Sequence, residues 1–325
     1  MVSSSPRQLV PSTDPFEEAA QLAADLVEAL EEVIRGRPEA VGLSVGALLS
    51  GGHLLIEDVP GVGKTMLAKA LARSVGASFR RVQATPDLVP GELTGVSMYS
   101  KEREEWQFHP GPLFAHVVVV DEINRATPRT QSALLEAMEE RQVTVDGATH
   151  ILPDPFFLVA TQNPFEYAGT FPLVEGQRDR FALVVAIGHL PPEDERDLLL
   201  GAGGMEALDR LEPVTDVARL RAAIATVHQV HCSPAVARYI VELGAASRAH
   251  PEVRLGASPR ASLAVLQAAR AHAVMSGRAY VAPDDVKAVA VACLAHRFIL
   301  SGDTDRPAGV AVVQGLLEAV AVPRG

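Results

Sequence analysis

The sequence of 325 residues contains only two cysteines and no long apolar run. No window approaches the roughly 18 to 20 apolar residues that a membrane-spanning helix needs, and the N-terminus lacks the basic and apolar blocks of a secretory signal. Cys232 and Cys293 lie far apart within helical patterns, which favours small buried side chains over a disulfide or a metal site. These features predict a cytoplasmic protein without a membrane span.

Dense clusters of lysine and arginine are also absent, and the formal net charge is -11. A nucleic-acid partner would therefore need a local basic patch that outweighs the repulsive field of the whole molecule. Lys101 with Arg103, and the scattered arginines of the last third, sit beside acidic residues, as is typical of solvated surfaces. Histidines such as His53, His109 and His116 show no metal-ligand spacing. We therefore expect neither a nucleic-acid surface nor a histidine metal site.

The N-terminal part begins with a stretch that has no helical or strand periodicity. Residues 1–15 are rich in serine and proline, which predicts a flexible tail. From Phe16 to about Ile34 the apolar residues recur at helical spacing, and Asp14-Pro15 can supply the cap and the first turn. An amphipathic helix is therefore expected to precede the core.

Five short apolar runs alternate with helical stretches in the part that follows. Strands separated by helices predict a parallel α/β sheet. The run from Val117 to Val120 has no polar alternation, which is expected of a strand buried on both faces in the middle of a sheet. The predicted strands are His53–Ile56, Phe79–Val82, Val117–Val120, Phe156–Ala160 and Ala182–Ile187. Together with the first helix they assign residues 16–188 to one α/β core.

Beyond the Pro191-Pro192 pair the strand pattern ends. Several later segments open with the residues that begin helices, a cap side chain or a proline in the first turn. These segments are Thr215-Asp216, Ser233-Pro234, Ser258-Pro259 and Pro283-Asp284-Asp285. Residues 189–325 are therefore predicted to form a second, all-helical domain.

The strongest local signal is a loop between the first predicted strand and an Ala/Leu-rich helix, where a phosphate-binding loop (P-loop) belongs. Its glycines let successive backbone N–H groups face the phosphates, the helix N-terminus adds partial positive charge, and Lys64 neutralises phosphate oxygens. Asp58 replaces the first glycine of the motif and is expected to tolerate a positive φ there. The predicted ATP-binding residues are Asp58, Val59, Pro60, Gly61, Val62, Gly63, Lys64, Thr65 and Met66.

A second signal is the pair Asp121-Glu122, which follows four consecutive valines. Open α/β sheets place their ligands at the carboxyl ends of the strands, and two acids at that position are not packing residues. Together with the hydroxyl of Thr65, Asp121 is expected to hold Mg²⁺. Glu122 is expected to polarise the water that attacks the γ-phosphate. The pair therefore predicts hydrolysis of ATP.

The predicted strand at 156–160 is followed by Thr161-Gln162-Asn163-Pro164. If this strand neighbours the one that ends in Asp121, Asn163 lies beside the same phosphate and can orient the attacking water. A turn asparagine before proline is the alternative.

These motifs and the segments around them closely resemble the MoxR family of AAA+ ATPases over residues 30–300. The resemblance rests on DEINRA at 121–126, QSALLEAMEERQVTVDG at 131–147, ATQNP at 160–164, FEYAGTF at 165–171, GASPRA at 256–261 and the loop at 60–65. It implies a P-loop core followed by a helical lid, and ATP hydrolysis with Mg²⁺. It also implies a homo-oligomer, a hexameric ring, whose active sites lie between subunits.

The same resemblance implies an arginine that reaches from one subunit to the γ-phosphate held by its neighbour, and Arg180 matches this residue. The family usually has leucine at the position of Arg178, so either arginine could reach across. A guanidinium suits the chemistry in both cases, and a surface ion pair between Arg180 and Asp179 is the alternative. Arg260, at the start of a lid helix, matches the family's second sensor of the γ-phosphate.

Three further segments match the family. Val33–Arg37 resembles the lining of the adenine pocket. Pro86–Gly95, and a predicted hairpin over Gln142–Leu152 that turns on Asp146-Gly147, resemble inserts that face the pore or the axial surface of such rings. We expect these inserts to pass ATP-driven motion to a client; edge loops without a client are the alternative.

The leading interpretation is a chaperone-like ATPase that remodels or activates a client or co-chaperone protein. The resemblance points to partners with a von Willebrand factor A domain. A nucleic-acid motor, a metal-chelatase motor subunit and a nucleotide-controlled scaffold that barely hydrolyses ATP are the alternatives, and the acidic balance speaks against the first. The candidate catalytic residues are Lys64, Asp121, Glu122, Asn163, Arg180 and Arg260.

Overall fold

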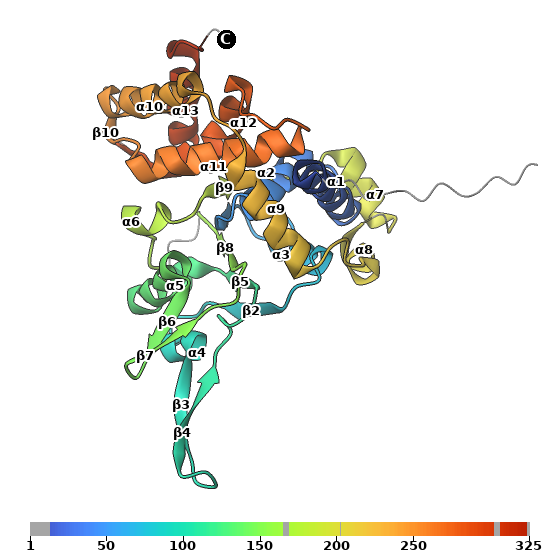
Figure 1. Ribbon diagram of the computed structural model, residues 1–325, viewed down its shortest axis with the longest axis vertical. Helices are drawn as coiled ribbons and strands as arrows, with labels where there is room; N and C mark the ends of the chain where they lie inside the picture. Colours follow the sequence, from blue (N-terminus) through green and yellow to red (C-terminus); the bar gives the residue numbers. More distant parts are fainter. Residues whose placement is uncertain (1–13, 165–168, 202, 302–305, 324–325) are drawn as a thin grey trace, which may run out of the picture.

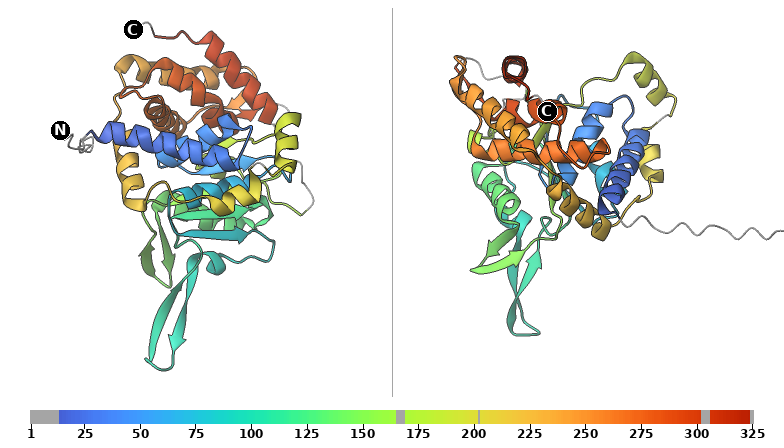
Figure 2. Two further views of the ribbon diagram at one scale, coloured as in Figure 1. Left: turned by 90° about the vertical axis from the view of Figure 1, so that its right-hand side faces the viewer. Right: turned by 45° about the horizontal axis from the view of Figure 1, so that its top comes forward.

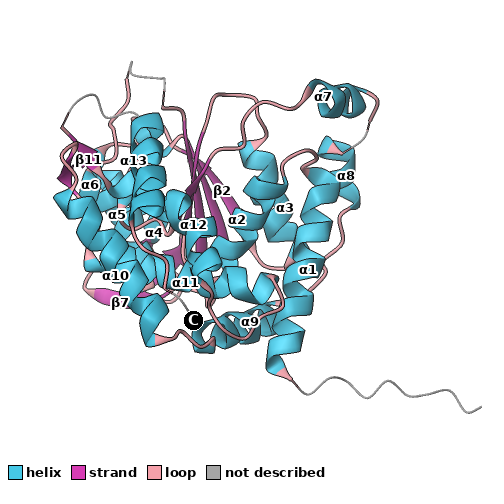
Figure 3. Ribbon diagram, turned by 90° about the horizontal axis from the view of Figure 1, so that it is seen from above, coloured by secondary structure: helices cyan, strands magenta, loops and turns pink. Residues whose placement is uncertain are grey.

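A five-stranded parallel sheet lies at the centre of the molecule (Figure 3). The computed structural model describes residues 14–164, 169–201, 203–301 and 306–323. Its strand order is β2-β5-β8-β1-β9, so the predicted parallel sheet is confirmed. β5 is an interior strand, as expected, but β8 occupies the middle. The strands are β1 (Leu54–Glu57), β2 (Phe79–Gln83), β5 (Val117–Asp121), β8 (Phe157–Gln162) and β9 (Leu183–Val185).

Helices cover both faces of this sheet. Alternate residues of a strand therefore belong to two separate apolar clusters, one on each face. In β5, Val117 and Val119 join the cluster that includes the first helices and the lid, whereas Val118 and Val120 join the cluster around α5. Burial on both faces explains why these strands are almost continuously apolar. The core helices are α1 (Pro15–Val33), α2 (Pro38–Leu49), α3 (Lys64–Ser74), α4 (Pro90–Thr94), α5 (Pro128–Glu140) and α6 (Glu175–Arg178), with the 3-10 turn η1 (Ile123–Arg125).

The C-terminal part is predominantly helical, and its last four α-helices lie above the sheet in Figure 1. A short antiparallel pair, β10 (Val253–Leu255) and β11 (Ile299–Leu300), joins two of its segments. The domain boundary near residue 189 stays a prediction. The helices are α7 (Pro192–Leu199), α8 (Gly204–Arg210), α9 (Val217–Gln229), α10 (Pro234–Ala249), α11 (Pro259–Met275), α12 (Pro283–Leu294), the 3-10 turn η2 (Ala295–Arg297) and α13 (Arg306–Ala319).

The helix starts that the sequence indicates are formed by side-chain caps. Asp14 accepts a hydrogen bond from the backbone N–H of Phe16 at 2.9 Å, and proline follows in the first turn of α1. Asp216 and Ser258 cap α9 and α11 in the same way. Each cap satisfies a backbone donor that an isolated helix end leaves free.

Two hairpins project from the core on the side away from the lid (Figures 1 and 2). The predicted hairpin is confirmed: β6 (Gln142–Val145) and β7 (Ala148–Ile151) pair around Asp146 and Gly147, which have φ angles of 50° and 80°. The longer hairpin of β3 (Gly95–Ser100) and β4 (Glu105–Pro110) was not predicted. Phe108 of β4 stacks on His150 of β7, with 3.7 Å between the ring centroids, and so connects the two hairpins.

Some sequence predictions fall outside the described residues. These are most of the predicted tail and positions 165–168 of the FEYAGTF motif. Within the described part of the chain, none of the helices combines the length and the apolar character that crossing a membrane requires.

Candidate functional site

The phosphate-binding loop joins β1 to α3, as predicted, and its glycines adopt a backbone that other residues avoid. Gly61 and Gly63 have φ angles of 87° and 97°. Among the described residues, none beyond the chain neighbours would lie within 4 Å of a Cβ added at either glycine. Gly63 is the N-cap of α3, whose first N–H groups have no partner within the helix. Open space and free backbone donors at a helix N-terminus suit a phosphate.

Asp58 plays a different part in this loop from the one expected. The described non-glycine residues with positive φ do not include Asp58, so tolerance of a left-handed turn is not the reason for aspartate here. Its carboxylate instead accepts backbone N–H groups from Val59 at 2.7 Å, Ile187 at 2.7 Å and Gly188 at 2.6 Å. Asp58 thus fastens the loop to the chain that leaves β9 toward the lid.

Lys64 folds back over the phosphate-binding loop. Its ammonium donates to the carbonyl of Asp58, to that of Val59 at 3.2 Å and to that of Gln162 at 3.4 Å. Burial lowers the pKa of Lys64, and nearby carboxylates, Asp58 first among them, oppose the shift. The lysine is therefore held at the mouth of the loop by backbone oxygens that a phosphate oxygen can replace.

Thr65 and Asp121 come together from different elements. The hydroxyl of Thr65 donates to Oδ1 of Asp121 at 2.9 Å, and the hydroxyl of Thr161 donates to the same oxygen at 3.3 Å. The other carboxylate oxygen binds Nε of Arg81 at 2.6 Å. Asp121 is buried. Adjacent hydroxyl and carboxylate oxygens fit the ligand preference of Mg²⁺.

Glu122 follows Asp121 and adopts a left-handed backbone with φ 56°. Its carboxylate accepts a hydrogen bond from Nε2 of Gln83 at 3.1 Å and forms an ion pair with Arg125 at 2.8 Å. The backbone N–H of Glu122 donates to the hydroxyl of Thr161 at 3.1 Å. The side chain is partly exposed, so it can reach a water molecule at the edge of the sheet.

Asn163 lies at the same edge of the sheet. Strand β8 runs between β5 and β1, with Ala160 opposite Val120 and Gln162 opposite Glu57. The strand that precedes Asn163 therefore does neighbour the strand that ends in Asp121, as the sequence prediction required. Asn163 is half-buried one residue beyond β8, and its role in orienting water stays a prediction.

The two candidate arginines, Arg178 at the end of α6 and Arg180 shortly after it, have different partners. Arg178 reaches inward, where Nη2 contacts Oε1 of Glu57 at 3.0 Å, and Gln162 donates to the same buried carboxylate. Arg180 instead forms an ion pair with Glu139 of α5 at 2.8 Å and donates to the carbonyl of Gly176 at 2.8 Å. The expected alternative, a pair between Arg180 and Asp179, is not the contact observed.

Arg260 joins Arg180 on the same carboxylate. Arg180 binds Oε2 of Glu139 and Arg260 binds Oε1. The hydrogen bond from Arg180 is the main reason why the pKa of Glu139 lies below its usual value, and the charge of Arg260 adds to it. Arg180, predicted to reach a neighbour's γ-phosphate, and Arg260, predicted to sense one, thus bind the same side chain, although the first comes from the core and the second from the lid.

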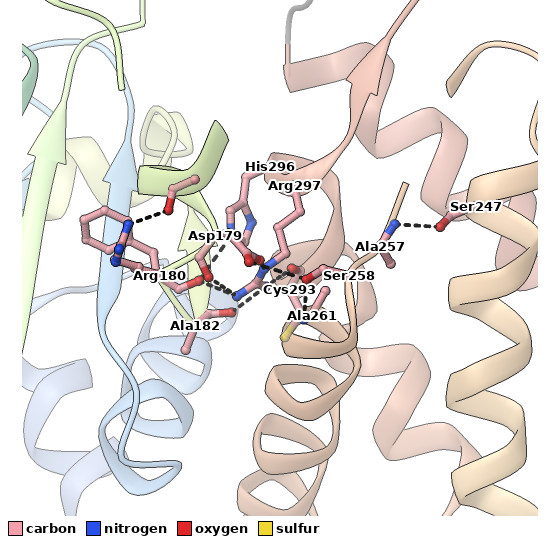
Figure 4. Close-up of polar contacts among 12 residues, drawn as sticks. Asp179, Arg180, Ala182, Ser247, Ala257, Ser258, Ala261, Cys293, His296 and Arg297 are labelled. Atoms are coloured by element: carbon pink, nitrogen blue, oxygen red, sulfur yellow. Dashed lines mark hydrogen bonds and ion pairs between the residues drawn. The ribbon is translucent and has the colours of Figure 1, made fainter. Parts of the chain in front are cut away.

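A buried arginine fastens the segment around Arg180 to the lid (Figure 4). Arg297 of η2 pairs with Asp179 at 2.7 Å and donates to the carbonyl of Phe181 at 2.7 Å. Ser258, the cap of α11, donates to the other oxygen of Asp179 at 3.4 Å. Asp179 therefore connects the ends of the two segments that carry Arg180 and Arg260.

The segment expected to line an adenine pocket contacts the chain that leads to the lid. Arg37 donates from Nη2 to the carbonyl of Gly188 at 3.0 Å. A hollow of about 510 Å³ lies beside it, lined by α1, by residues 35–38 and by α7. Gly188 is also a partner of Asp58, so Gly188 links Arg37, at the wall of this hollow, to the phosphate-binding loop.

Several neighbours of the site were not predicted from the sequence. Gln83 and Arg81 belong to β2, whose carboxyl end meets the same sheet edge as Asp121, and this register is the signal that could have indicated them. Glu139 gave no such signal, because it lies at the end of an ordinary amphipathic helix.

Comparisons with known proteins agree with this arrangement. Residues 53–183 match the family described as "ATPase family associated with various cellular activities (AAA)", and residues 245–315 match the AAA lid domain. A putative ATPase of Cytophaga hutchinsonii superposes with a TM-score of 0.86 at 30% identity, covering 95% of this chain and 97% of that one. Fold and site thus define an AAA-type ATPase core with its lid.

Proteins of similar sequence identify the family within this class. The uncharacterized protein YeaC of Bacillus subtilis is 45% identical over 309 residues, which cover 94% of this chain and 97% of YeaC. Chaperone MoxR1 of Mycobacterium tuberculosis is 41% identical over 309 residues, 91% of this chain and 81% of the relative. Protein MoxR of Methylorubrum extorquens is 32% identical over 89% of each chain. The chain belongs to the MoxR family of AAA+ ATPases.

Proposed function

We propose that this chain hydrolyses ATP with Mg²⁺ in sites that form between neighbouring subunits of a ring, and that it uses the energy to remodel or activate a client protein. One observation supports this most strongly. The candidate catalytic side chains fall into two groups on the chain, one around Lys64 and Asp121 and one around Glu139. Each group carries half of the chemistry that phosphoryl transfer needs.

The first group binds the nucleotide and the attacking water. Lys64 and the backbone donors of the loop neutralise the phosphates, while Thr65 and Asp121 hold Mg²⁺, which shields the negative charge that the phosphate oxygens carry. Glu122 accepts a proton from the water as general base. For that step its carboxylate must leave Gln83 or Arg125, which now bind it. Asn163 orients the same water.

The second group stabilises the charge that develops on the phosphate of the adjacent subunit. Arg180 is our choice for the arginine that reaches across, because the carboxylate with which it pairs, that of Glu139, is partly exposed and not buried. Arg178 is a poor choice, since it balances the buried Glu57. Arg260 shares Glu139 with Arg180, so we assign both arginines to the same face and to the same neighbouring nucleotide.

The long hairpin is our candidate for client contact. Tyr99 and Trp106 pair across its strands, 5.7 Å apart between ring centroids, and Trp106 is 71% exposed. Phe108 lies on the same face and stacks on His150, so the aromatic surface continues to the core. Exposed aromatic side chains bind apolar polypeptide segments. Trp106→Ala should reduce the stimulation of ATP turnover by a permanently unfolded polypeptide.

The proposal is tested by the steady-state rate of ATP hydrolysis per subunit, measured as the protein concentration is raised. Shared sites make the specific rate climb with concentration in the wild type. Arg180→Ala should abolish turnover while ATP still binds. Arg221→Ala is the matched control, because Arg221 also forms an exposed ion pair, with Asp154. A wild-type rate that is independent of concentration and equal in Arg180→Ala would refute the shared site.

A further inference from the structure

A hollow of about 1000 Å³ lies between α6, α10, β10 and the start of α11. Its lining is largely apolar, and several of its large side chains are solvent-exposed rather than covered by the chain itself. Val241 is 58% exposed, Leu255 50% and Leu263 61%. A cluster of exposed aliphatic side chains around a concave surface marks a site of contact.

This hollow adjoins the face on which the two arginines lie. Asp179, Ser258 and Pro259 contribute to its wall, and these residues immediately precede Arg180 and Arg260 in the sequence. If the arginines face a neighbouring subunit, as proposed above, the hollow faces that subunit as well. The inference therefore rests on the proposed function.

The chain also carries an exposed apolar projection. Leu199 is 83% exposed and Leu200 79%, at the end of α7, and Met205 of α8 is 54% exposed. Figures 1 and 3 show α7 and α8 at one end of the molecule, and α6 and α10 at the other. The projection is thus too far away to fill the hollow of its own chain.

Charges around the two surfaces are opposite in sign. The lining of the hollow includes Arg248, Arg254 and Arg297 and two carboxylates. Arg297 pairs with Asp179, so Arg248 and Arg254 outnumber the remaining carboxylate, Glu175. Helix α7 is acidic, with one arginine among four carboxylates. Those carboxylates are Glu193, Asp194, Glu195 and Asp197. Such complementarity steers the two surfaces together and opposes contact between like surfaces.

We propose that Leu199, Leu200 and Met205 of one copy pack into the hollow at Val241 and Leu263 of the next copy. The two surfaces differ and lie at opposite ends of the molecule, so the contact is head-to-tail. A head-to-tail contact repeats from copy to copy and closes a ring when the rotation between copies allows it. In that neighbour Gly188, which lies shortly before α7, binds Asp58 of the phosphate-binding loop, so the same contact brings Arg180 and Arg260 toward the part of the neighbour that carries this loop.

Two double variants of the full chain test this contact. Leu199→Glu with Leu200→Glu changes the projection, and Val241→Glu with Leu263→Glu changes the hollow. The mass of each is measured by analytical ultracentrifugation with ATP and Mg²⁺. Ile151→Glu, at a position that is 71% exposed on the β6–β7 hairpin, is the control. Unchanged thermal unfolding and ADP binding show that each variant is folded.

Each double variant alone should be monomeric, with association at least tenfold weaker than in the control. An equimolar mixture should form dimers and nothing larger, because only one intact projection and one intact hollow can meet. Wild-type assembly by either double variant, or a mixture that stays monomeric, would overturn the inference. If the contact is refuted in this way but the wild type still forms a ring whose ATPase rate depends on concentration, the proposed function stands. A wild type that is monomeric and fully active would refute both the contact and the proposed function.

Discussion

Arg180 and Arg260 bind the two oxygens of one carboxylate, that of Glu139. The first arginine belongs to the core and the second to the lid, and Asp179, Ser258 and Arg297 connect the two segments. Because the lid and this part of the core are joined, a rotation of the lid changes the position of both arginines together. If the two arginines face a γ-phosphate, as we propose, its loss can therefore be transmitted to the lid.

Mixing two inactive variants should restore ATP hydrolysis. Glu122→Gln removes the proposed general base but keeps Arg180, and Arg180→Ala does the reverse. The loss of an arginine that reaches the γ-phosphate is expected to lower turnover about 10³-fold. In randomly mixed rings about a quarter of the interfaces join two intact halves. We expect turnover of that order from the mixture, measured by phosphate release.

The control for this experiment is a mixture of Glu122→Gln with Lys64→Ala. Both changes lie in the same half-site, so no interface in the mixed ring recovers a complete site. Recovery in the control, or none in the test mixture, would contradict a site shared between subunits.

Arg178 and Arg180 should separate stability from catalysis. Arg178→Leu takes the arginine partner from Glu57, which is 4% exposed. The carboxylate stays buried with Gln162 as a donor, so the change should cost about 3 kcal/mol of unfolding free energy. Arg180→Ala breaks a half-exposed pair and should cost less than about 0.5 kcal/mol. Urea unfolding measures the loss of stability in each variant, and the rate of ATP hydrolysis measures the loss of catalysis, which should be large only in Arg180→Ala. The opposite pattern would make Arg178 the arginine that reaches across.

Much of the site follows from the sequence because its chemistry lies in consecutive residues. A strand, a glycine loop and a helix put Lys64 and Thr65 in place, and the carboxyl ends of parallel strands gather Asp121 and Asn163. These rules need no knowledge of distant contacts. They also predict the α/β core and the position of the helical lid.

The remaining features depend on pairings between distant segments. The contacts of Asp58 with Ile187 and Gly188 link residues far apart in the sequence, and those of Glu139 depend on how α5, α6 and α11 pack. The β3–β4 hairpin was missed because it covers no core: Met98 and Trp106 are both exposed. Trp106 and Phe108 alternate with the polar residues Gln107 and His109, and this short alternation is the signal that could have indicated β4.

The Mg²⁺ affinity should depend on Arg81. Arg81 now occupies one oxygen of Asp121, so it competes with a cation for the same carboxylate. Arg81→Ala should lower the Mg²⁺ concentration that half-saturates the binding of a fluorescent ATP analogue by about two- to tenfold, whereas Asp121→Asn should raise it at least tenfold. The control is Arg80→Ala, since Arg80 of the same strand donates to the carbonyl of Phe79. Equal effects of Arg80→Ala and Arg81→Ala would refute the competition.

Stability should fall in mild acid because of His53. This histidine is buried, accepts the N–H of Leu158 at Nδ1 (3.1 Å) and contacts the carbonyl of Met138 with Nε2 (3.1 Å). Burial, assisted by the charge of Arg141, lowers its pKa from 6.5 to about 3. Folding therefore requires the neutral ring, which the unfolded chain protonates below pH 6.5. The free energy of unfolding should decrease by up to about 1.4 kcal/mol per pH unit as the pH falls from 6.5 toward 3.

Urea midpoints at pH 7, 6 and 5 measure this loss. His53→Gln carries no ionisable group, so its unfolding free energy should be lower at pH 7, because packing is lost, but should fall less steeply with acid than that of the wild type. His109→Gln, at an exposed position, should keep the wild-type slope. If His53→Gln loses stability with acid as steeply as the wild type does, then the acid sensitivity comes from other groups, and His53 is protonated without cost in the folded chain.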